Sequence, residues 1–227
     1  MNRILIWSQT MNLFSGTSLT CERGGRRVFS GLDFNLSGGE SMVLVGPNGS
    51  GKSSLLRLLA GLIKPTAGDI TWNGVGIIED LEAHCRRLQF LGHSDAVKPV
   101  FSVAENISFW ASVMRGSSDV KQSTVNALKM FEISHLADIP GRFLSAGQRR
   151  RVNLARIVAS PAPLWLLDEP TTSLDKETIL ILENIISCHC KNGGIVVISA
   201  HNEMRLPNCQ VLDLLDFNME QTELDPI

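Results

Sequence analysis

The chain has 227 residues, of which 44% are hydrophobic and 19% charged, and its formal net charge at pH 7 is −2. A chain of this length can bury a sizeable core in one domain, and so small a net charge excludes the strong basic field of many nucleic-acid-binding proteins. No apolar run approaches the roughly 18 residues of a membrane-spanning helix, and Ile4–Trp7 is too short for a signal-peptide core. We therefore expect a cytoplasmic protein with no nucleic-acid partner, whose contact with any membrane is peripheral.

Two glycine pairs punctuate residues 11–40, at Gly24-Gly25 and Gly38-Gly39. Glycine pairs supply the backbone conformations of tight turns, so we expect antiparallel strands and hairpins in this region. Residues 41–92 and 160–215 are predicted to form an α/β core around a mostly parallel sheet. Residues 95–158 are predicted to be a helical insertion into that core.

A glycine-rich turn lies between a predicted strand and a predicted helix. The apolar run SMVLV at 41–45 is typical of a buried parallel strand, and GPNGSGKS at 46–53 follows it directly. Apolar residues at helical spacing come next: Leu55, Leu58, Leu59 and Leu62. A tight turn of this kind aims successive N–H groups at one point, and the helix N-terminus adds partial positive charge. The arrangement predicts a site for a polyphosphate.

Individual residues of this turn have distinct chemistry. Gly46, Gly49 and Gly51 let the backbone come close to the phosphates, Lys52 can reach the β- and γ-phosphates, and the Ser53 hydroxyl can ligate Mg²⁺. We therefore predict that Mg²⁺ and a nucleoside triphosphate bind here. The predicted nucleotide-binding residues of the turn are Gly46, Pro47, Asn48, Gly49, Ser50, Gly51, Lys52, Ser53 and Ser54.

The predicted helical insertion carries three aromatic residues near its start, Phe101, Phe109 and Trp110. They are either internal packing, as large apolar residues usually are, or part of a surface for a partner protein. Near the end of the insertion, LSAGQ at 144–148 precedes a segment with Leu154, Ile157 and Val158 on one helical face.

Three arginines follow LSAGQ, at Arg149, Arg150 and Arg151. They lie in the first turn of the predicted helix, where the helix dipole disfavours cations. Two interpretations stay open: a solvated face, or at least one arginine serving an interface that faces phosphate.

A pair of carboxylates ends another buried-strand run, LWLL at 164–167. Asp168, at the carboxyl edge of a strand beside the phosphate loop, can hold Mg²⁺ through a water. Glu169, one residue further on, can polarise the attacking water as a general base. The alternative is that Asp168-Glu169-Pro170 simply ends a strand and begins a turn, but the register with the phosphate loop favours the catalytic interpretation.

The C-terminal part contains a tempting cysteine pair, Cys188-His189-Cys190. It lies near the end of an amphipathic segment and lacks CxxCH spacing, so we expect helix packing rather than ligation. The odd number of scattered cysteines favours reduced thiols: Cys21, Cys85, Cys188, Cys190 and Cys209. The acidic tail from Asp213 is expected to fray.

The order of these motifs resembles that of the nucleotide-binding subunits of ABC transporters over nearly the whole chain. The order comprises the loop at 46–53, a signature at 144–148, Asp168-Glu169, a loop at 173–175 and His201 after the Val/Ile-rich strand 194–200. The resemblance implies an α/β P-loop cassette with a mostly parallel core sheet, an antiparallel N-terminal β subdomain and an inserted helical subdomain. It places one such domain at residues 11–227, with the helical subdomain at about 95–158 and residues 1–10 as an extension.

The resemblance also implies roles that no motif alone establishes. Two copies would close around two Mg-ATP, with the phosphate loop of one copy facing the signature of the other. The signature residues acting in trans would be Leu144, Ser145, Ala146, Gly147 and Gln148, with Ser145 and Gly147 contacting the γ-phosphate. The dimer loop would be Ser173, Leu174 and Asp175. His201 would contact the γ-phosphate and, with Glu169, orient the attacking water.

Two positions depart from the family pattern. Ser94 follows LGH at 91–93, where the family usually has a Gln that touches Mg²⁺; it has a shorter reach and needs a bridging water, and Gln89 lies inside the predicted strand. The usual adenine-stacking aromatic is also missing, since the chain has no Tyr. Arg23 is the candidate to stack on adenine instead. The alternative is that Glu22 and Arg23 are solvated turn residues.

A closer resemblance is to the ATP-binding subunits of cytochrome c maturation (haem exporter) transporters. It rests on Cys21-Glu22-Arg23, LGH at 91–93, LSAGQRRRV at 144–152 and GGIVVISAH at 193–201. It implies ATP hydrolysis that powers a separate integral membrane permease subunit, for haem export or release of a haem chaperone. The chain would then lie at the cytoplasmic face of the inner membrane.

Other functions stay open at this point. The chain could serve another ABC transporter, or be a soluble ABC ATPase of a cytosolic assembly pathway such as iron–sulfur assembly. A single phosphate loop and a single signature disfavour a tandem-cassette factor. Glu169 and His201 disfavour a module that binds nucleotide without hydrolysing it.

Overall fold

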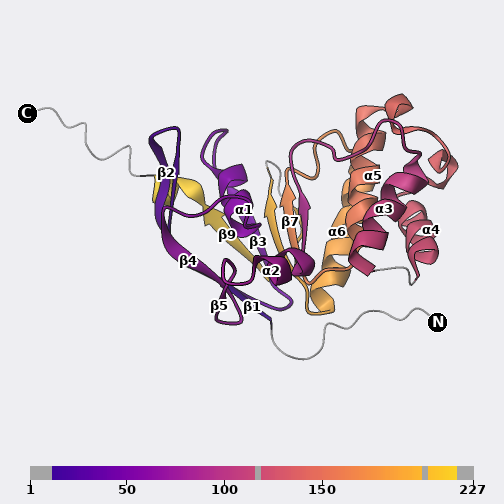
Figure 1. Ribbon diagram of the computed structural model, residues 1–227. Coiled ribbons are helices and arrows are strands. Elements are labelled where there is room, and N and C mark those ends of the chain that lie inside the picture. The colour runs from indigo at the N-terminus through magenta and orange to yellow at the C-terminus, as the bar shows by residue number, and fades with distance from the viewer. Residues whose placement is uncertain (1–11, 116–118, 201–203, 219–227) are drawn as a thin grey trace, which may run out of the picture.

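The computed structural model describes residues 12–115, 119–200 and 204–218, whose strands form two sheets (Figure 1). The antiparallel sheet has the order β2-β1-β4-β5 and the parallel sheet the order β6-β7-β8-β3-β9. The antiparallel strands are β1 (Leu13–Arg23), β2 (Arg26–Ser37), β4 (Ala67–Trp72) and β5 (Val75–Gly76). The parallel strands are β3 (Ser41–Val45), β6 (Leu88–Leu91), β7 (Leu164–Asp168), β8 (Ile195–Ser199) and β9 (Cys209–Asp213).

The helices lie on both sides of the parallel sheet. In Figure 1, α1 lies between the two sheets, whereas α3, α4 and α5 form a separate layer beyond α6. The α-helices are α1 (Lys52–Leu59), α2 (Leu81–Arg87), α3 (Val103–Arg115), α4 (Val120–Met130), α5 (Ala146–Ala159) and α6 (Lys176–Lys191). The short 3₁₀ turns are η1 (Ser134–Leu136), η2 (Gly141–Phe143) and η3 (Leu214–Phe217). The α/β cassette architecture expected from the motif order is confirmed.

The N-terminal hairpin forms as its glycines predict. Gly24 and Gly25, with φ angles of 57° and 77°, connect β1 to β2, which pair antiparallel. The expectation that all of residues 41–92 join the α/β core is wrong, because β4 and β5 extend the antiparallel sheet instead. The reason is tertiary: β4 pairs with β1, and this pairing brings Trp72 beside Phe14, with ring centroids 5.8 Å apart.

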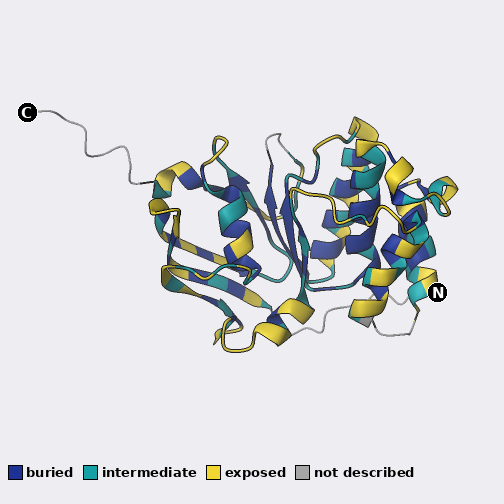
Figure 2. Ribbon diagram, turned by 45° about the horizontal axis from the view of Figure 1, so that its top comes forward, coloured by how far each residue is buried: buried dark blue, intermediate teal, exposed yellow. Residues whose placement is uncertain are grey.

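The parallel strands β7 and β8 are buried at every position, as Figure 2 shows for the strands at the centre of the molecule. Their side chains alternate between two hydrophobic cores, because successive residues of a strand point to opposite faces. Leu164, Leu166 and Val197 pack into the core with the antiparallel sheet and α1. Trp165 and Leu167 pack into the core with the helical layer. Each strand therefore joins both halves of the molecule.

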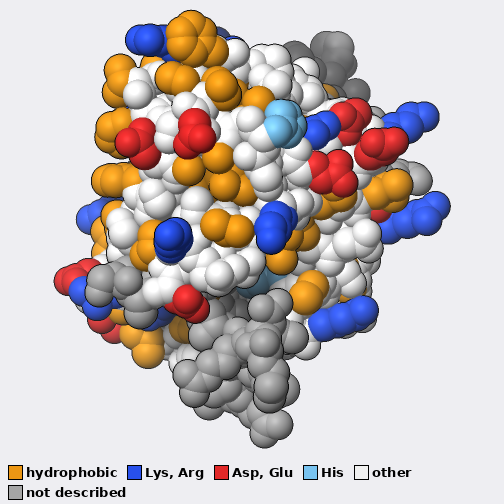
Figure 3. All heavy atoms as spheres, turned by 90° about the vertical axis from the view of Figure 1, so that its right-hand side faces the viewer, with side chains coloured by type: hydrophobic (Ala, Val, Ile, Leu, Met, Phe, Trp, Pro, Cys, Tyr) orange, Lys and Arg blue, Asp and Glu red, His pale blue; other side chains and the backbone are white. Residues whose placement is uncertain are grey.

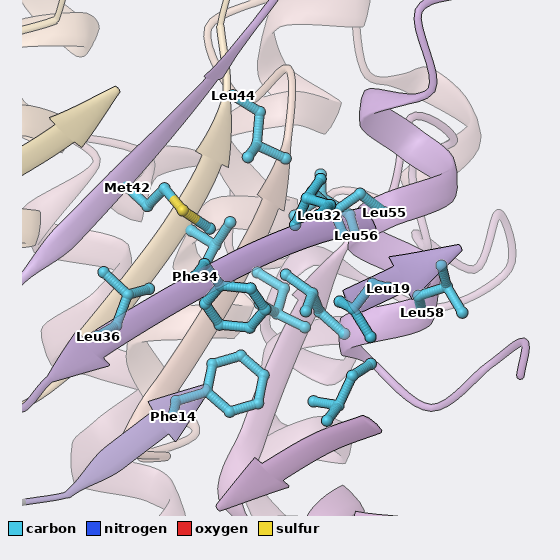
Figure 4. Packing of buried hydrophobic residues seen from close by; sticks show 14 of the residues in the cluster. Phe14, Leu19, Leu32, Phe34, Leu36, Met42, Leu44, Leu55, Leu56 and Leu58 are labelled. Atoms are coloured by element: carbon cyan, nitrogen blue, oxygen red, sulfur yellow. The ribbon is translucent and has the colours of Figure 1, made fainter. Parts of the chain in front are cut away.

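The first core lies between the two sheets. Figure 4 shows Phe14 and Phe34 together, with Met42 and Leu44 of β3 pointing into the same space. The two phenylalanine rings meet edge to face with centroids 5.4 Å apart. Leu55, Leu58 and Leu59 of α1 are fully buried here, but Leu62 lies beyond the end of α1 and is 61% exposed, so the predicted face of α1 is shorter than expected.

The C-terminal segment is more ordered than an acidic tail suggests. Leu214 is fully buried in the first core, and Asp213 accepts a hydrogen bond from the backbone N–H of Leu215 at 2.9 Å. The expected fraying from Asp213 is therefore wrong for residues 213–217, because Leu214 anchors η3. Residues 219–227 lie outside the described part of the chain.

Cys188-His189-Cys190 lies in α6, where His189 and Cys190 are packed inside as expected but Cys188 is exposed. The His189 ring stacks on the Trp165 ring with centroids 3.9 Å apart, and burial lowers the pKa of His189 to about 4. Cys190 is also buried, and burial raises the pKa of its thiol to about 12. Across the described residues, no helix is long and apolar enough to cross a membrane.

Candidate functional site

The phosphate loop joins β3 to α1 in the conformation that its glycines favour. Gly46, Gly49 and Gly51 have φ angles of 129°, 85° and 105°, which are strained for other residues. Gly51 caps α1, and a Cβ on it would lie 2.5 Å from Val28 Cγ1. Glycine is therefore required there by both backbone conformation and space, and α1 begins at Lys52 with its N–H groups facing the loop.

Lys52 is buried although it is a lysine, with 6% of its surface exposed. Its ammonium donates to the carbonyl oxygens of Gly46 at 2.7 Å and Pro47 at 3.0 Å. These bonds hold the charge inside the loop. A cation and helix N–H groups at one loop are the chemistry that suits a polyphosphate.

The structure brings the phosphate loop and Glu169 to one cavity of about 260 Å³. Glu169 follows β7 directly, and β8 lies between β7 and β3, so the strand order brings the carboxylate close to the loop that follows β3. Arg23 reaches the same cavity from the end of β1. The residues that line it are Arg23, Val28, Asn48, Gly49, Gly51, Lys52, Ser53, Ser54 and Glu169.

Residues 168–170, named the catalytic turn after the role that the sequence predicts for Glu169, have a strained centre. Glu169 has a φ angle of 47°, a conformation that costs on the order of 1 kcal/mol or more outside glycine. Asp168 is 2% exposed. Its carboxylate and the Ser53 hydroxyl are hard oxygen donors, the kind of ligand that Mg²⁺ prefers, so the donor set fits this ion. Among the described residues, no cluster of three or more His, Cys, Asp or Glu side chains could hold a metal.

Ser199 is a residue of this site that the sequence analysis missed. Its hydroxyl donates to Asp168 Oδ1 at 2.8 Å and accepts from the Glu169 N–H at 2.9 Å. The side chain is fully buried at the end of β8. A polar residue closing the apolar run 195–198, two residues before His201, is the signal that could have identified it. His201 itself lies outside the described residues.

The signature begins α5 through its own side chains. Ser145 Oγ accepts from the Gln148 N–H at 3.2 Å, and Gln148 Oε1 accepts from the Ser145 N–H at 2.9 Å. This capping box explains locally why S-x-x-Q starts a helix. Leu144 is buried in the helical core, whereas Ser145 and Ala146 are exposed.

The signature lies beside the dimer loop of the same chain. A Cβ on Gly147 would lie 2.9 Å from the carbonyl oxygen of Ser173, so the loop packs against the helix start. Arg151 forms an ion pair with Asp175, which also caps α6 by accepting from the Thr178 N–H at 2.8 Å. Hydrogen bonds from Thr178, together with the Arg151 guanidinium, lower the pKa of Asp175.

A second cavity of about 260 Å³ opens at the signature. Its residues from the signature region and dimer loop are Ser145, Gly147, Gln148, Arg151, Ser173 and Asp175. None of its lining residues belongs to the cavity of the phosphate loop. Within one copy, the signature and the phosphate loop therefore line different cavities.

The arginines after the signature have three different environments. Arg150 is 3% exposed and donates to backbone carbonyls of the catalytic turn. The solvated-face interpretation is therefore wrong for Arg150. Arg151 is paired with Asp175, and Arg149 is half-buried.

Arg23 lies where a nucleobase could reach it from the phosphate loop. It lines a wider cavity of about 830 Å³ together with Arg26, Arg27 and, from the C-terminal segment, Leu215 and Asn218. Arg23 is exposed, so both the stacking and the solvated interpretations fit its position.

The segment after β6 lies near the catalytic turn. Gln89 is buried inside β6, as expected, and Ser94 is exposed beyond the strand. The neighbouring His93 was not anticipated: its Nδ1 lies 3.9 Å from Glu169 Oε2.

The aromatic residues of the helical layer are only partly internal. Phe101 is 38% exposed and Phe109 46% exposed, so internal packing is wrong for these two. Trp110 is half-buried and meets the Phe109 ring edge to face. The Arg156 guanidinium lies over the Trp110 ring, with Cζ 4.8 Å from the ring centroid. Figure 3 shows hydrophobic side chains spread over this helical side of the molecule, interspersed with charged side chains of both signs.

Solved structures of ATP-binding cassettes share this fold. A putative ABC transporter ATP-binding protein from Pyrococcus furiosus superposes with a TM-score of 0.80 at 26% identity, covering 90% of this chain and 98% of that one. A dimeric ATP-binding cassette in a post-hydrolysis state with ADP and phosphate gives a TM-score of 0.73 at 26% identity, covering 83% and 88%.

Sequence comparisons agree with the fold. The family model described as ABC transporter matches residues 29–172. The cytochrome c biogenesis ATP-binding export protein CcmA of Paramagnetospirillum magneticum is 55% identical over 205 residues, which cover 90% of this chain and 94% of that protein. The CcmA of Rhodospirillum rubrum is 52% identical over 206 residues, covering 90% and 87%. The chain therefore belongs to the ABC transporter family, within the group of cytochrome c biogenesis ATP-binding export proteins.

Proposed function

We propose that this chain is the ATP-hydrolysing subunit of an ABC transporter for cytochrome c biogenesis, with residues 11–227 as one cassette. The observation that carries the proposal is the cavity that joins Lys52 and Ser53 of the phosphate loop to Glu169. A polyphosphate-binding turn and a carboxylate on one cavity supply the two parts that ATP hydrolysis needs. Identity to CcmA proteins over nearly their full length supports the biological setting.

The residues divide the chemistry among them. Lys52 and the N-terminus of α1 stabilise negative charge on the phosphates. Glu169 acts as general base on a water that attacks the γ-phosphate in line, and His201 helps to orient that water. The Ser53 hydroxyl and, through a water, Asp168 would hold Mg²⁺, which would neutralise negative charge on the phosphates.

Two further residues complete the nucleotide site in this proposal. Arg23 stacks its guanidinium plane on the base, since it lines both the phosphate-loop cavity and the wider cavity beside it. Ser94 takes the position usually held by Gln and reaches Mg²⁺ only through a water.

A second copy completes the site. Residues of the signature and of the dimer loop line a cavity that shares no residue with the phosphate-loop cavity of the same chain: Ser145, Gly147, Gln148, Ser173 and Asp175. A partner copy is therefore needed to bring its signature to this phosphate loop. The dimeric structure of a solved cassette bound to ADP and phosphate supports the pairing of two copies. In this proposal the two copies enclose two Mg-ATP.

The membrane partner is a separate permease subunit. In this proposal the chain is peripheral, at the cytoplasmic face of the inner membrane. The exposed Phe101 and Phe109 contribute to the surface that receives the permease. Closing and opening of the dimer moves that subunit, either for haem export or for release of a haem-carrying chaperone.

Purification of the tagged chain from detergent-solubilised membranes, followed by mass spectrometry, tests the proposal. We expect a multi-span membrane protein to co-purify, accompanied by haem-handling proteins of cytochrome c maturation. A partner from an unrelated transport system would assign the chain to another ABC transporter. Recovery only from the soluble fraction, with cytosolic assembly factors, would favour the soluble ABC ATPase and overturn the membrane assignment.

A further inference from the structure

Arg150 has an unexpected environment for a cation in the first turn of a helix. It belongs to α5, which begins at Ala146, and the partial positive charge of a helix N-terminus disfavours a cation nearby. Only 3% of Arg150 is exposed. Burying a charge is costly unless other groups of the protein compensate it. The partners of Arg150 therefore indicate why it is there.

One edge of the guanidinium binds the catalytic turn. Arg150 Nη2 donates to the carbonyl oxygens of Asp168 at 2.9 Å and Glu169 at 2.5 Å, and Nε donates to that of Pro170 at 3.3 Å. Three consecutive carbonyls are thus held by one side chain from α5.

The remaining nitrogen binds the segment after β6. Arg150 Nη1 donates to the Gly92 carbonyl and to Asp95 Oδ1, both at 3.3 Å. Asn153, one turn further along α5, donates to the same Asp95 oxygen at 3.2 Å. All five N–H donors of the guanidinium are therefore used, and they join three segments that lie far apart in sequence.

The backbone at Glu169 needs such support. Its φ angle of 47° lies in the left-handed region, which a glutamate keeps only when surrounding groups determine it. Ser199 holds the Glu169 N–H, and Arg150 holds the Glu169 carbonyl. Ser199 belongs to β8 and Arg150 to α5, and together they define where the Glu169 side chain starts.

We infer that Arg150 is a positioning residue for hydrolysis, which fixes the catalytic turn to the start of α5 and to the segment after β6. The inference rests on the proposed ATPase function and deepens it. It means that the geometry of Glu169 follows the helical layer, because α5 carries both Arg150 and the signature. A displacement of α5 relative to the parallel sheet moves the backbone of the general base.

Arg150→Lys is the most direct test because lysine keeps the positive charge but lacks the planar set of donors of the guanidinium group. Lysine has three donors at one point and cannot span the carbonyls of the turn and the Gly92 segment together. We expect kcat for ATP hydrolysis to fall roughly 10-fold, while the Kd for ATP changes less than about twofold, because positioning is lost and phosphate binding is kept. Both are measured on the full chain purified from solubilised membranes.

Arg156→Lys is the matched control. Arg156 lies on the same helix and is 7% exposed, but it donates to the Phe90 carbonyl at 3.1 Å and covers Trp110. Its replacement disturbs the packing of α5 through contacts away from the catalytic turn. Urea unfolding measures the free energy of unfolding of both variants, so that each kcat can be expressed per folded molecule.

Asp95→Ala provides a second test. The Asp95 side chain is 27% exposed, and its removal leaves the Arg150 guanidinium in place with its backbone partners. We expect a roughly threefold fall in kcat with unchanged ATP affinity, since the backbone acceptors of Arg150 remain. Equal kcat in Arg150→Lys and Arg156→Lys, parallel loss of ATP affinity, or an unaltered kcat in Asp95→Ala would overturn the inference. Failure of the proposed function is distinguishable, because the wild-type chain itself would then show no turnover.

Discussion

The phosphate loop and the catalytic turn lie on one cavity but are built in different ways. The loop is held by its own residues: Lys52 bonds to carbonyls five and six positions away. The catalytic turn is held by Ser199 and Arg150, from elsewhere in the chain. The conformation of the loop therefore depends on hydrogen bonds within its own segment. The conformation of the turn depends on hydrogen bonds from distant parts of the fold. Substitutions in the loop should therefore affect binding, and substitutions around the turn should affect hydrolysis.

Glu169→Gln should have the largest effect and should separate the two regions most clearly. Glutamine keeps the shape of the side chain but cannot accept the proton of the attacking water, so we expect hydrolysis to fall roughly 1000-fold with ATP affinity retained. An ATP-bound dimer should accumulate, as measured by size-exclusion chromatography with ATP. Glu177→Gln, at an exposed acid in the first turn of α6, is the control. Rapid hydrolysis by Glu169→Gln would contradict the assignment of the base.

Lys52→Ala should weaken ATP binding at the phosphate loop and leave the catalytic turn unchanged. Loss of the charge that faces the phosphates should weaken ATP binding roughly 100-fold, equivalent to about 2.7 kcal/mol. Titration calorimetry with ATP measures the affinity, and circular dichroism checks the fold. The exposed Lys64 offers Lys64→Ala as a control for general charge. ATP binding of wild-type strength in Lys52→Ala would remove the basis for the phosphate-loop role.

Ser199→Ala should act on the turn without touching the loop. It removes the hydroxyl that binds both Asp168 and the Glu169 N–H, which is worth about 1–3 kcal/mol at a buried site. We expect kcat to fall roughly 10-fold with a small change in ATP affinity. Ser199→Thr keeps a hydroxyl and should retain most of the activity. If the two variants are equally active, the hydroxyl does not position the turn.

The smallest predicted effect is on the pH dependence of folding stability. It comes from His189, which stacks on Trp165 of β7, the strand that precedes the catalytic turn. Burial lowers the His189 pKa to about 4 in the folded chain, against an ordinary value of 6.5. Between these values the unfolded chain binds a proton that the folded chain does not, so the stability is fully present above pH 6.5 and is lost as pH falls towards 4. At pH 5.5 the free energy of unfolding should be about 1 kcal/mol lower than at pH 7 because of His189.

His189→Phe keeps an aromatic ring against Trp165 and removes the titration. Urea unfolding of both proteins at pH 7.0 and 5.5 measures the difference. We expect the free energy of unfolding of the variant to decrease less on acidification, by about 1 kcal/mol. The same decrease in both proteins would show that His189 does not cause the pH dependence.

Features built from neighbouring residues could be predicted from the sequence. The glycines, Lys52 and Ser53 of the phosphate loop are contiguous, and their backbone requirements are met within one turn between β3 and α1. The capping box of the signature is equally local, with Ser145 and Gln148 three residues apart. The β4–β5 segment was misplaced because its sheet is chosen by pairing with β1, a contact between residues about 56 positions apart.

The sequence by itself determined the glycine-rich turn between β3 and α1, the start of the signature helix and the buried strand that ends at Asp168. Short-range hydrogen bonds and apolar periodicity suffice to specify these features. The tertiary structure alone decided the burial of Arg150, the hydroxyl contacts of Ser199, the 3.9 Å separation of His93 and Glu169, and the exposure of Phe101 and Phe109. Each depends on distant segments meeting, and the side chains alone do not indicate which segments meet.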